Sequence, residues 1–251
     1  MCRTAIIIGA SGLVGKEVLK QLLIDSDTTK KIISGKSICS SENNTETNSI
    51  FSKIIIFVRE PIALTHEKLE QHVINFDAIE DYCNLIKGNI VFCCLGTTIK
   101  KALSRDAFLK VDYTYPLELA KIAKKNGVKS FLIISSVGAN THSSNFYLKV
   151  KGDVEAALEK IDFTSLIVMR PSLLLGDRNE FRFGELAFKV LMKFFSFAFV
   201  GKLRKYRAIE SVVVAKAMVR LSILSMNKAS VSKLSGLNIF QSDSIAELGK
   251  D

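Results

Sequence analysis

Apolar residues come in short continuous runs that alternate with segments in which apolar positions recur every three or four residues. The runs predict strands covered on both faces, and the second pattern predicts amphipathic helices. The expected strands are Ala5–Ile8, Lys53–Val58, His72–Asn75, Asn89–Cys94, Ser130–Ser135, Phe163–Met169 and Leu237–Phe240. The expected helices are Leu13–Ile24, Ala78–Leu85, Arg105–Asn126, Asn145–Lys160, Phe183–Phe195 and Glu210–Ser225.

Alternating strands and helices predict βαβ units and a parallel sheet, and 251 residues fit one α/β domain, 1–251. The helix at 105–126 should end at Gly127, and Pro116 should bend it or start a new segment. The stretch Thr28–Ser49 is rich in Ser, Thr and Asn and far exceeds the usual connection of about 2–6 residues. We interpret 28–49 as a flexible surface insertion; a helix extension or a binding loop is the alternative.

A glycine-rich turn joins the first expected strand to the first expected helix. The sequence Gly9-Ala10-Ser11-Gly12-Leu13-Val14-Gly15 follows the strand directly. Gly9 permits a tight turn, Gly12 lets the backbone approach a phosphate, and Gly15 lets the helix pack close to the strand. The helix N-terminus then offers free N–H groups to a pyrophosphate. We predict a dinucleotide site at Gly9, Ser11, Gly12, Leu13, Val14 and Gly15, against the alternative of a turn with no ligand.

Composition and charge narrow the function classes without selecting one. The chain is 48% hydrophobic and 24% charged, with a formal net charge of +10. Its lysines are scattered along helices, which is typical of a solvated surface and favours anionic ligands in general. No pattern typical of nucleic-acid binding is present. The five cysteines show no disulfide pattern, and the sequence has neither a signal peptide nor an apolar run of about 18–20 residues. These features predict a cytoplasmic protein.

A second group of polar residues points to proton transfer. Ser135 and Ser136 end an expected strand, and Tyr147 and Lys151 lie four apart, on one face of an expected helix. An unperturbed tyrosine ionises near pH ~10, and a nearby ammonium lowers that value by stabilising tyrosinate. Such a tyrosine passes a proton to or from a carbonyl or alcohol. Alone, this spacing describes an ordinary amphipathic surface, but its place after the fifth strand favours catalysis.

The remaining strand ends suggest the other half of a cofactor site. Arg59 ends the second strand, where an arginine accommodates the 2′-phosphate of NADP and an acidic residue would bind the ribose of NAD. Asp77 follows the third strand and is placed near the adenine. Leu95, Gly96 and Thr97 follow the fourth, beside the ribose and nicotinamide. NADP(H) is therefore preferred over NAD(H), with a solvated Arg59 as the alternative.

The chain resembles the Tat-interactive-protein-like oxidoreductases, an atypical branch of the short-chain dehydrogenases/reductases. The resemblance runs through most of the sequence, in the blocks Gly9–Gly15, Cys94–Thr98, Val111–Tyr113, Ser135–Ala139, Ser144–Gly152, Arg170–Arg178 and Ile245–Lys250. It implies a Rossmann-type, doubly wound, three-layer αβα fold with NADP(H) as cofactor.

The resemblance also implies residue roles. Tyr147 takes the acid/base position, Lys151 the ribose-binding position, and Ser136 fits the carbonyl-polarising serine better than Ser135. Arg170 and Pro171 should lie near the nicotinamide. Asp112 stands where many relatives have an asparagine, which leaves a proton-relay role for this position open.

The late apolar stretch Leu186–Gly201 has three interpretations: a core or substrate-cover helix, a subunit contact, or a membrane-surface helix extending over 186–205. We favour the first, as part of a small substrate-covering region at 176–207. The three histidines show no metal spacing, and no metal is expected.

The sequence thus predicts an NADP(H)-dependent oxidoreductase, a monomer or homodimer, acting on a small carbonyl or alcohol substrate. A non-catalytic NADP(H)-binding redox sensor or regulator is the main alternative. A nucleotide-sugar epimerase or dehydratase is the third, although 251 residues leave little room for the larger C-terminal domain of such enzymes.

Overall fold

A seven-stranded parallel sheet forms the centre of the computed structural model, which describes residues 3–23, 50–176, 204, 206–227 and 231–250. The strand order is β3-β2-β1-β4-β5-β6-β9. The strands are β1 (Thr4–Ile8), β2 (Lys53–Val58), β3 (Leu69–Val73), β4 (Ile90–Cys93), β5 (Ser130–Ile134), β6 (Ser165–Arg170) and β9 (Gly236–Gln241). The chain moves outward from β1 to β3, returns to β4 beside β1, and then moves the other way, which is the doubly wound order predicted.

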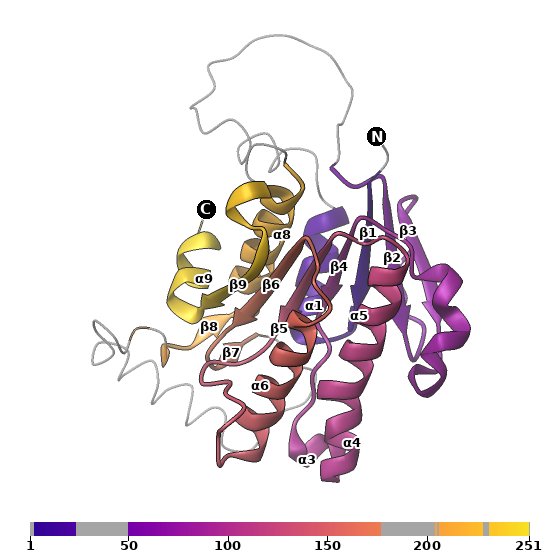
Figure 1. Ribbon diagram of the computed structural model, residues 1–251. Coiled ribbons are helices and arrows are strands. Elements are labelled where there is room, and N and C mark those ends of the chain that lie inside the picture. The colour runs from indigo at the N-terminus through magenta and orange to yellow at the C-terminus, as the bar shows by residue number, and fades with distance from the viewer. Residues whose placement is uncertain (1–2, 24–49, 177–203, 205, 228–230, 251) are drawn as a thin grey trace, which may run out of the picture.

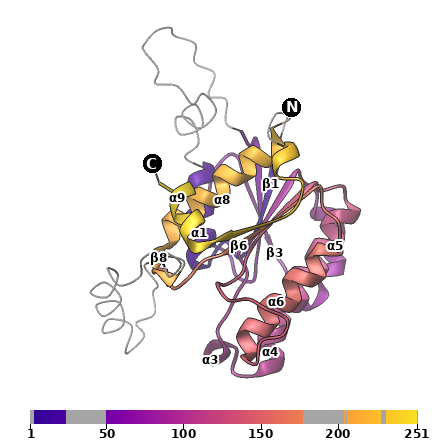
Figure 2. The same ribbon diagram turned by 60° about the vertical axis from the view of Figure 1, so that its left-hand side comes forward.

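Helices cover both faces of this sheet (Figures 1 and 2). α1 (Leu13–Leu23), α8 (Ser211–Met226) and α9 (Ser242–Leu248) lie on one face, and α5 (Tyr115–Lys125) and α6 (Phe146–Glu159) lie on the other. Side chains alternate across the strands, so Ile7 joins the first apolar core while Ile6 and Ile8 join the second. The predicted three-layer αβα architecture is confirmed.

The expected helix 105–126 is divided into three pieces. α4 (Arg105–Leu109) passes into a π-helical turn, η2 (Lys110–Thr114), before α5 starts at Tyr115. Pro116 lies in the first turn of α5, directly after the π-helical turn, and the backbone stays right-handed helical there, so the predicted boundary is a change of helix type. Gly127 has φ +82° just past the end of α5, as expected of a helix stop.

Several elements differ from the sequence prediction. The third strand lies a few residues earlier than predicted, because it is a half-exposed edge strand without a continuous apolar run. The predicted helix 78–85 is a 3₁₀ segment, η1 (Phe76–Leu85). Short elements were not predicted: α3 (Ile99–Ala102), α9, η5 (Val231–Lys233) and the parallel pair of β7 (Leu174–Leu175) and β8 (Ile209–Glu210).

Two predicted regions fall outside the described residues. The structure does not describe the insertion 28–49 or the apolar segment 186–201. It also leaves out nearly all of the substrate-covering region predicted at 176–207. Among the helices that the structure does describe, none has the length and apolar character needed to cross a bilayer.

Candidate active site

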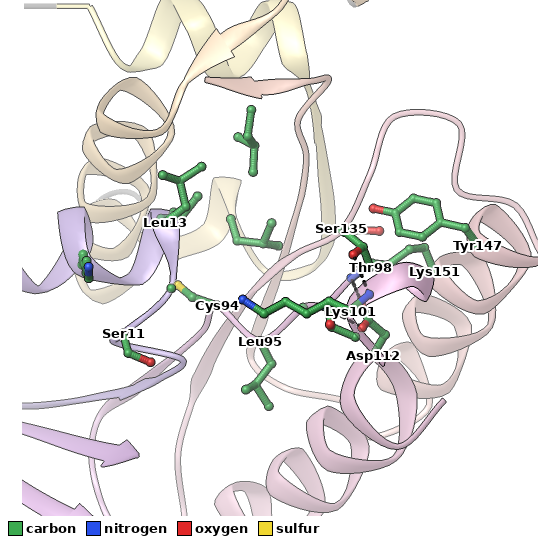
Figure 3. A pocket seen from close by; sticks show the side chains of 17 residues that line it. Ser11, Leu13, Cys94, Leu95, Thr98, Lys101, Asp112, Ser135, Tyr147 and Lys151 are labelled. Carbon is green, nitrogen blue, oxygen red and sulfur yellow. Dashed lines mark hydrogen bonds and ion pairs between the residues drawn. The ribbon is translucent and has the colours of Figure 1, made fainter. Parts of the chain in front are cut away.

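A cavity of about 480 Å³ opens at the carboxyl ends of β1, β4 and β5 (Figure 3). In open parallel sheets this edge, where the strand order reverses, is where ligands bind. The volume lies within the usual range for small-molecule sites, about 300–1,000 Å³. The lining residues are Ser11, Gly12, Leu13, Val14, Lys16, Cys94, Leu95, Gly96, Thr97, Thr98, Lys101, Asp112, Ile134, Ser135, Tyr147, Lys151 and Leu174.

The glycine turn forms one wall of this cavity, and its glycines are required by close backbone contacts. Gly9 has φ +82°, and a Cβ there would lie 2.7 Å from the Cys94 carbonyl oxygen. A Cβ on Gly15 would lie 2.1 Å from the Gly9 carbonyl oxygen. Only glycine therefore lets α1 begin so close to β1 and the β4 loop. Gly12, Leu13 and Val14 at the start of α1 line the cavity, and the N–H groups in the first turn of a helix are suited to bind a pyrophosphate.

Tyr147 and Lys151 lie on the opposite wall, in the first two turns of α6. Asn145 caps this helix, its side-chain oxygen accepting a hydrogen bond from the Leu148 N–H at 3.2 Å. The Tyr147 ring packs on Phe108 of α4, with ring centroids 5.8 Å apart. Figure 3 shows the Tyr147 hydroxyl directed toward the side of the cavity on which Ser135 and Lys151 lie.

A buried ion pair holds the lysine. Lys151 Nζ lies 2.7 Å from Asp112 Oδ1, and both side chains are almost fully buried. The second carboxylate oxygen accepts a hydrogen bond from the Thr97 N–H at 2.9 Å. The predicted β4 loop, Leu95 to Thr97, is thus joined to Lys151 through Asp112, and the π-helical turn η2 supplies this carboxylate. π-Helical turns occur frequently at functional sites.

The two serines occupy different places. Ser135 is buried and lines the cavity, whereas Ser136, the serine preferred from the sequence, is not among the lining residues that the structure describes. The Ser136 hydroxyl donates a long 3.4 Å hydrogen bond to its neighbour's carbonyl oxygen, that of Val137. The Ser135 hydroxyl donates to the carboxylate of Glu155. Of the two serines, Ser135 is therefore the one that faces the cavity, and the catalytic role predicted for Ser136 stays a prediction.

Glu155 connects Ser135 to Arg170. The guanidinium of Arg170 forms a forked contact with Glu155, its Nε lying 3.1 and 3.2 Å from the two carboxylate oxygens. Arg170 and Pro171, which were predicted to touch the cofactor, lie outside the described lining of the cavity. Arg170 supports the cavity wall through Glu155, and its contact with a cofactor stays a prediction.

Arg59 and Asp77 also lie outside that lining, as do Gly9 and Gly15. The Asp77 carboxylate accepts hydrogen bonds from the Lys110 ammonium and the Tyr115 hydroxyl, each at 2.8 Å. The Lys110 contact, followed by that of Tyr115, lowers the pKa of Asp77, while burial and then Asp77 raise the pKa of Tyr115 to about 12. Asp77 is thus engaged by side chains, and the adenine contact predicted for it remains a prediction.

Some lining residues gave no sequence signal. Lys16 and Lys101 are two lysines in a lysine-rich chain, yet both line the cavity, and Figure 3 shows Lys101 reaching across it toward Cys94. Cys94 is a poor nucleophile here, because burial raises the pKa of its thiol well above the ordinary value.

Glu155 was not predicted as a site residue, although its position one turn beyond Lys151 on the same helix face was a signal in the sequence. In the part of the chain that the structure describes, no cluster of His, Cys, Asp or Glu could hold a metal ion.

The chain is similar to known proteins over most of its length. A family model described as HIM1 matches residues 40–198. The chain is 35% identical to protein HTATIP2 of Rattus norvegicus over 254 residues, covering 99% of this chain and 90% of the rat protein. It is also 35% identical over 177 residues to the mitochondrial protein FMP52-1 of Scheffersomyces stipitis, covering 70% of this chain and 69% of that protein.

Solved structures share its fold at much lower identity. The Bordetella bronchiseptica enzyme WbmH in complex with NAD⁺ aligns with a TM-score of 0.62 and 15% identity, covering 99% of this chain and 80% of WbmH. MoeE5 in complex with UDP-glucose and NAD aligns with a TM-score of 0.58 and 11% identity, covering 98% of this chain and 80% of MoeE5. These likenesses establish a Rossmann-type fold.

Proposed function

This chain belongs to the family of proteins that includes HTATIP2 and is described by the HIM1 model, and from that premise we propose that it is an NADP(H)-dependent oxidoreductase. The family resemblance inferred from the sequence is confirmed by these matches. The proposed reaction moves a hydride and a proton between the cofactor and a carbonyl or alcohol substrate.

One observation carries the proposal: the glycine turn and the Tyr147–Lys151 pair face each other across a single cavity. A cavity that only held a dinucleotide would need the glycine turn and the β4 loop. Such a cavity would not need Tyr147 and Lys151. A tyrosine hydroxyl on the same side of the cavity as a buried ammonium is suited to proton transfer. The two features belong to segments more than 130 residues apart in the chain, and the fold brings them together.

The described lining offers groups of the kinds that would hold the proposed cofactor. The start of α1, with Ser11, Gly12 and Leu13, would hold the pyrophosphate, and Leu95 to Thr97 would border the ribose and nicotinamide. When bound, the nicotinamide supplies or accepts the hydride. The solved structures of two fold neighbours are complexes with NAD or NAD⁺, and Arg59 at the tip of β2 is our reason for preferring the phosphorylated form.

Tyr147 is the proposed proton donor and acceptor. In reduction its hydroxyl gives a proton to the substrate oxygen as hydride reaches the substrate carbon; in oxidation the tyrosinate takes the proton back. The Lys151 ammonium stabilises the tyrosinate and would also bond the ribose hydroxyls. Ser135, on the same wall, would contact the reacting oxygen, a role that the sequence assigned to Ser136.

The experiment that tests this proposal measures NADPH oxidation over a panel of aldehydes, ketones and quinones. We expect turnover of at least one class, with a loss of kcat of about 10-fold or more in Ser135→Ala and little change in Ser136→Ala. Tight NADPH binding without turnover of any panel member would instead support the redox-sensor alternative. Equal losses in both serine variants would remove the assignment of Ser135.

A further inference from the structure

Asp112 stands out among the cavity residues because it is a fully buried carboxylate. Its side chain is 0% exposed, and that of Lys151, 2.7 Å away, is 5% exposed. Among the described residues that line the cavity, Asp112 is the only acidic one. The ion pair thus places a buried negative and a buried positive charge in the wall of the cavity that also contains Tyr147.

A buried ammonium needs such a partner. Removing Lys151 from water favours the neutral amine and so acts to lower its pKa, but the charge of Asp112, followed by that of Tyr147, outweighs this effect. The resulting pKa of Lys151 lies above its ordinary value. Without the carboxylate, burial would be the largest remaining effect on the pKa of Lys151, and buried lysines lose their proton up to about 3–5 pH units below the usual value.

The other groups around Lys151 cannot replace this carboxylate. Glu155, one turn further along α6, is already paired with Arg170 and accepts the Ser135 hydroxyl. The effect of Tyr147 on the pKa of Lys151 is smaller than that of Asp112. Cys93 on β4 has a thiol whose pKa burial raises to about 12, so it carries no charge near neutral pH. Lys16 of α1 and Lys101 of α3, which also line the cavity, are cations and disfavour a further positive charge.

Asp112 is itself held in place from two sides. Its Oδ2 accepts the Thr97 N–H, and its Oδ1 has no hydrogen-bond partner among the described residues beyond the ion pair with Lys151. The π-helical turn η2 carries Asp112 between α4 and α5. The carboxylate therefore fixes Lys151 relative to the β4 loop as well as supporting its charge.

We propose that Asp112 is a positioning residue that keeps Lys151 an ammonium and holds it beside Tyr147. It acts through Lys151 rather than on the substrate. The catalytic consequence rests on the proposed function, whereas the effect on the charge of Lys151 does not, so the two can be tested separately.

The first test follows the ionisation of Lys151 without any turnover. The full-length protein is labelled with ¹³C at the lysine ε-carbons, the Lys151 signal is assigned with Lys151→Met, and its chemical shift is titrated against pH. We expect Asp112→Asn to lower the Lys151 midpoint by about 2 pH units or more. The control Asp106→Asn, an exposed carboxylate on α4, should leave it unchanged. A midpoint that moves by less than about half a unit in Asp112→Asn overturns the proposal.

The second test uses stability, in case Asp112→Asn folds poorly. An unpaired buried ammonium is costly, so the double variant Asp112→Asn/Lys151→Met should be more stable than Asp112→Asn alone. Recovery of folding or of the unfolding midpoint in the double variant supports the proposal. Equal or lower stability of the double variant contradicts it, because Asp112 would then act on the fold independently of Lys151.

The third test reads the consequence in turnover. In Asp112→Asn, activity should decline from a lower pH than in the wild type as Lys151 loses its proton, and Asp112→Glu should restore part of the high-pH range. A uniform loss of kcat at every pH would indicate a structural role only and would overturn the catalytic part. If the wild type turns over no substrate, the proposed function fails, while the titration still decides whether Asp112 keeps Lys151 charged.

Discussion

Single residues of this site differ in how firmly their surroundings hold them. Lys151 and Asp112 are buried and form an ion pair, and the Ser135 hydroxyl donates a hydrogen bond to Glu155. Arg59 is exposed at the end of β2, outside the described lining of the cavity. Buried groups have few alternative positions, whereas an exposed arginine reaches a ligand by changing rotamer. Cofactor preference is therefore the property most open to change by one substitution.

Replacing Arg59 tests this preference. Arg59→Ala should weaken NADPH binding by about 10- to 100-fold, the value of a charge-assisted contact to a phosphate, and change NADH binding by less than about two-fold. The quantity measured is the dissociation constant of each cofactor, by fluorescence titration. Glu60→Ala, at the neighbouring exposed position, is the matched control. Equal losses of affinity for NADPH and NADH in Arg59→Ala would show that Arg59 does not contact the 2′-phosphate.

Among the elements, α6 bears most of the proposed chemistry. It carries Tyr147, Lys151 and Glu155, and its N-cap, Asn145, lies two residues before the tyrosine. The cap fixes the first turn, because the Asn145 side chain satisfies the otherwise unpaired Leu148 N–H. The start of this helix thus bears on both stability and the placement of Tyr147.

The substitution Asn145→Ala should lower the free energy of unfolding by about 1 kcal/mol, measured by urea unfolding. Because Tyr147 lies in the turn that this cap fixes, kcat should fall as well. Asn145→Ser keeps a capping oxygen and should retain most of the stability. If Asn145→Ala and Asn145→Ser behave alike and match the wild type, the cap contributes nothing.

The elements that a sequence predicts well here are those with a strong local pattern. Six of the seven sheet strands match the predicted runs to within two residues at each end, and the glycine turn with α1 follows from Gly9 to Gly15. The β3 edge strand was placed too late, since Leu69 to Gln71 include polar, half-exposed positions. The π-helical turn η2 was not predicted, because no local signal distinguishes it from the α-helical segments on either side.

The site, too, was predictable only where its residues form a local pattern in the sequence. Tyr147 and Lys151 share one helix, so their spacing was visible in the sequence. The choice between Ser135 and Ser136 depends on which of two neighbours faces the cavity, and that direction is set by the end of β5. The Asp112–Lys151 pair joins segments 39 positions apart, which only tertiary packing brings together.

At the scale of the whole molecule, the reversal of strand order between β1 and β4 creates the cavity. The glycine turn comes from one half of the sheet, and Tyr147, Lys151 and Ser135 come from the other. A dinucleotide bound across this division would connect the two halves. Ligand binding and global stability should therefore be linked.

NADPH should accordingly raise the unfolding temperature. At a concentration near 100 times its dissociation constant, a ligand of the native state adds about 2.7 kcal/mol, which for a chain of this size corresponds to roughly 5–10 °C. Thermal unfolding followed by circular dichroism measures the change, with NADH at the same concentration giving a smaller one. An unchanged unfolding temperature with saturating NADPH and with NADH would contradict a dinucleotide site.

In the proposed mechanism, Tyr147 transfers a proton while hydride moves between cofactor and substrate. The most direct measurement compares kcat of the wild type and Tyr147→Phe on a substrate that the wild type reduces, alongside NADPH dissociation constants for both. We predict a kcat loss of about 10²- to 10⁴-fold with nearly unchanged NADPH binding. A Tyr147→Phe variant that retains wild-type kcat would contradict the mechanism.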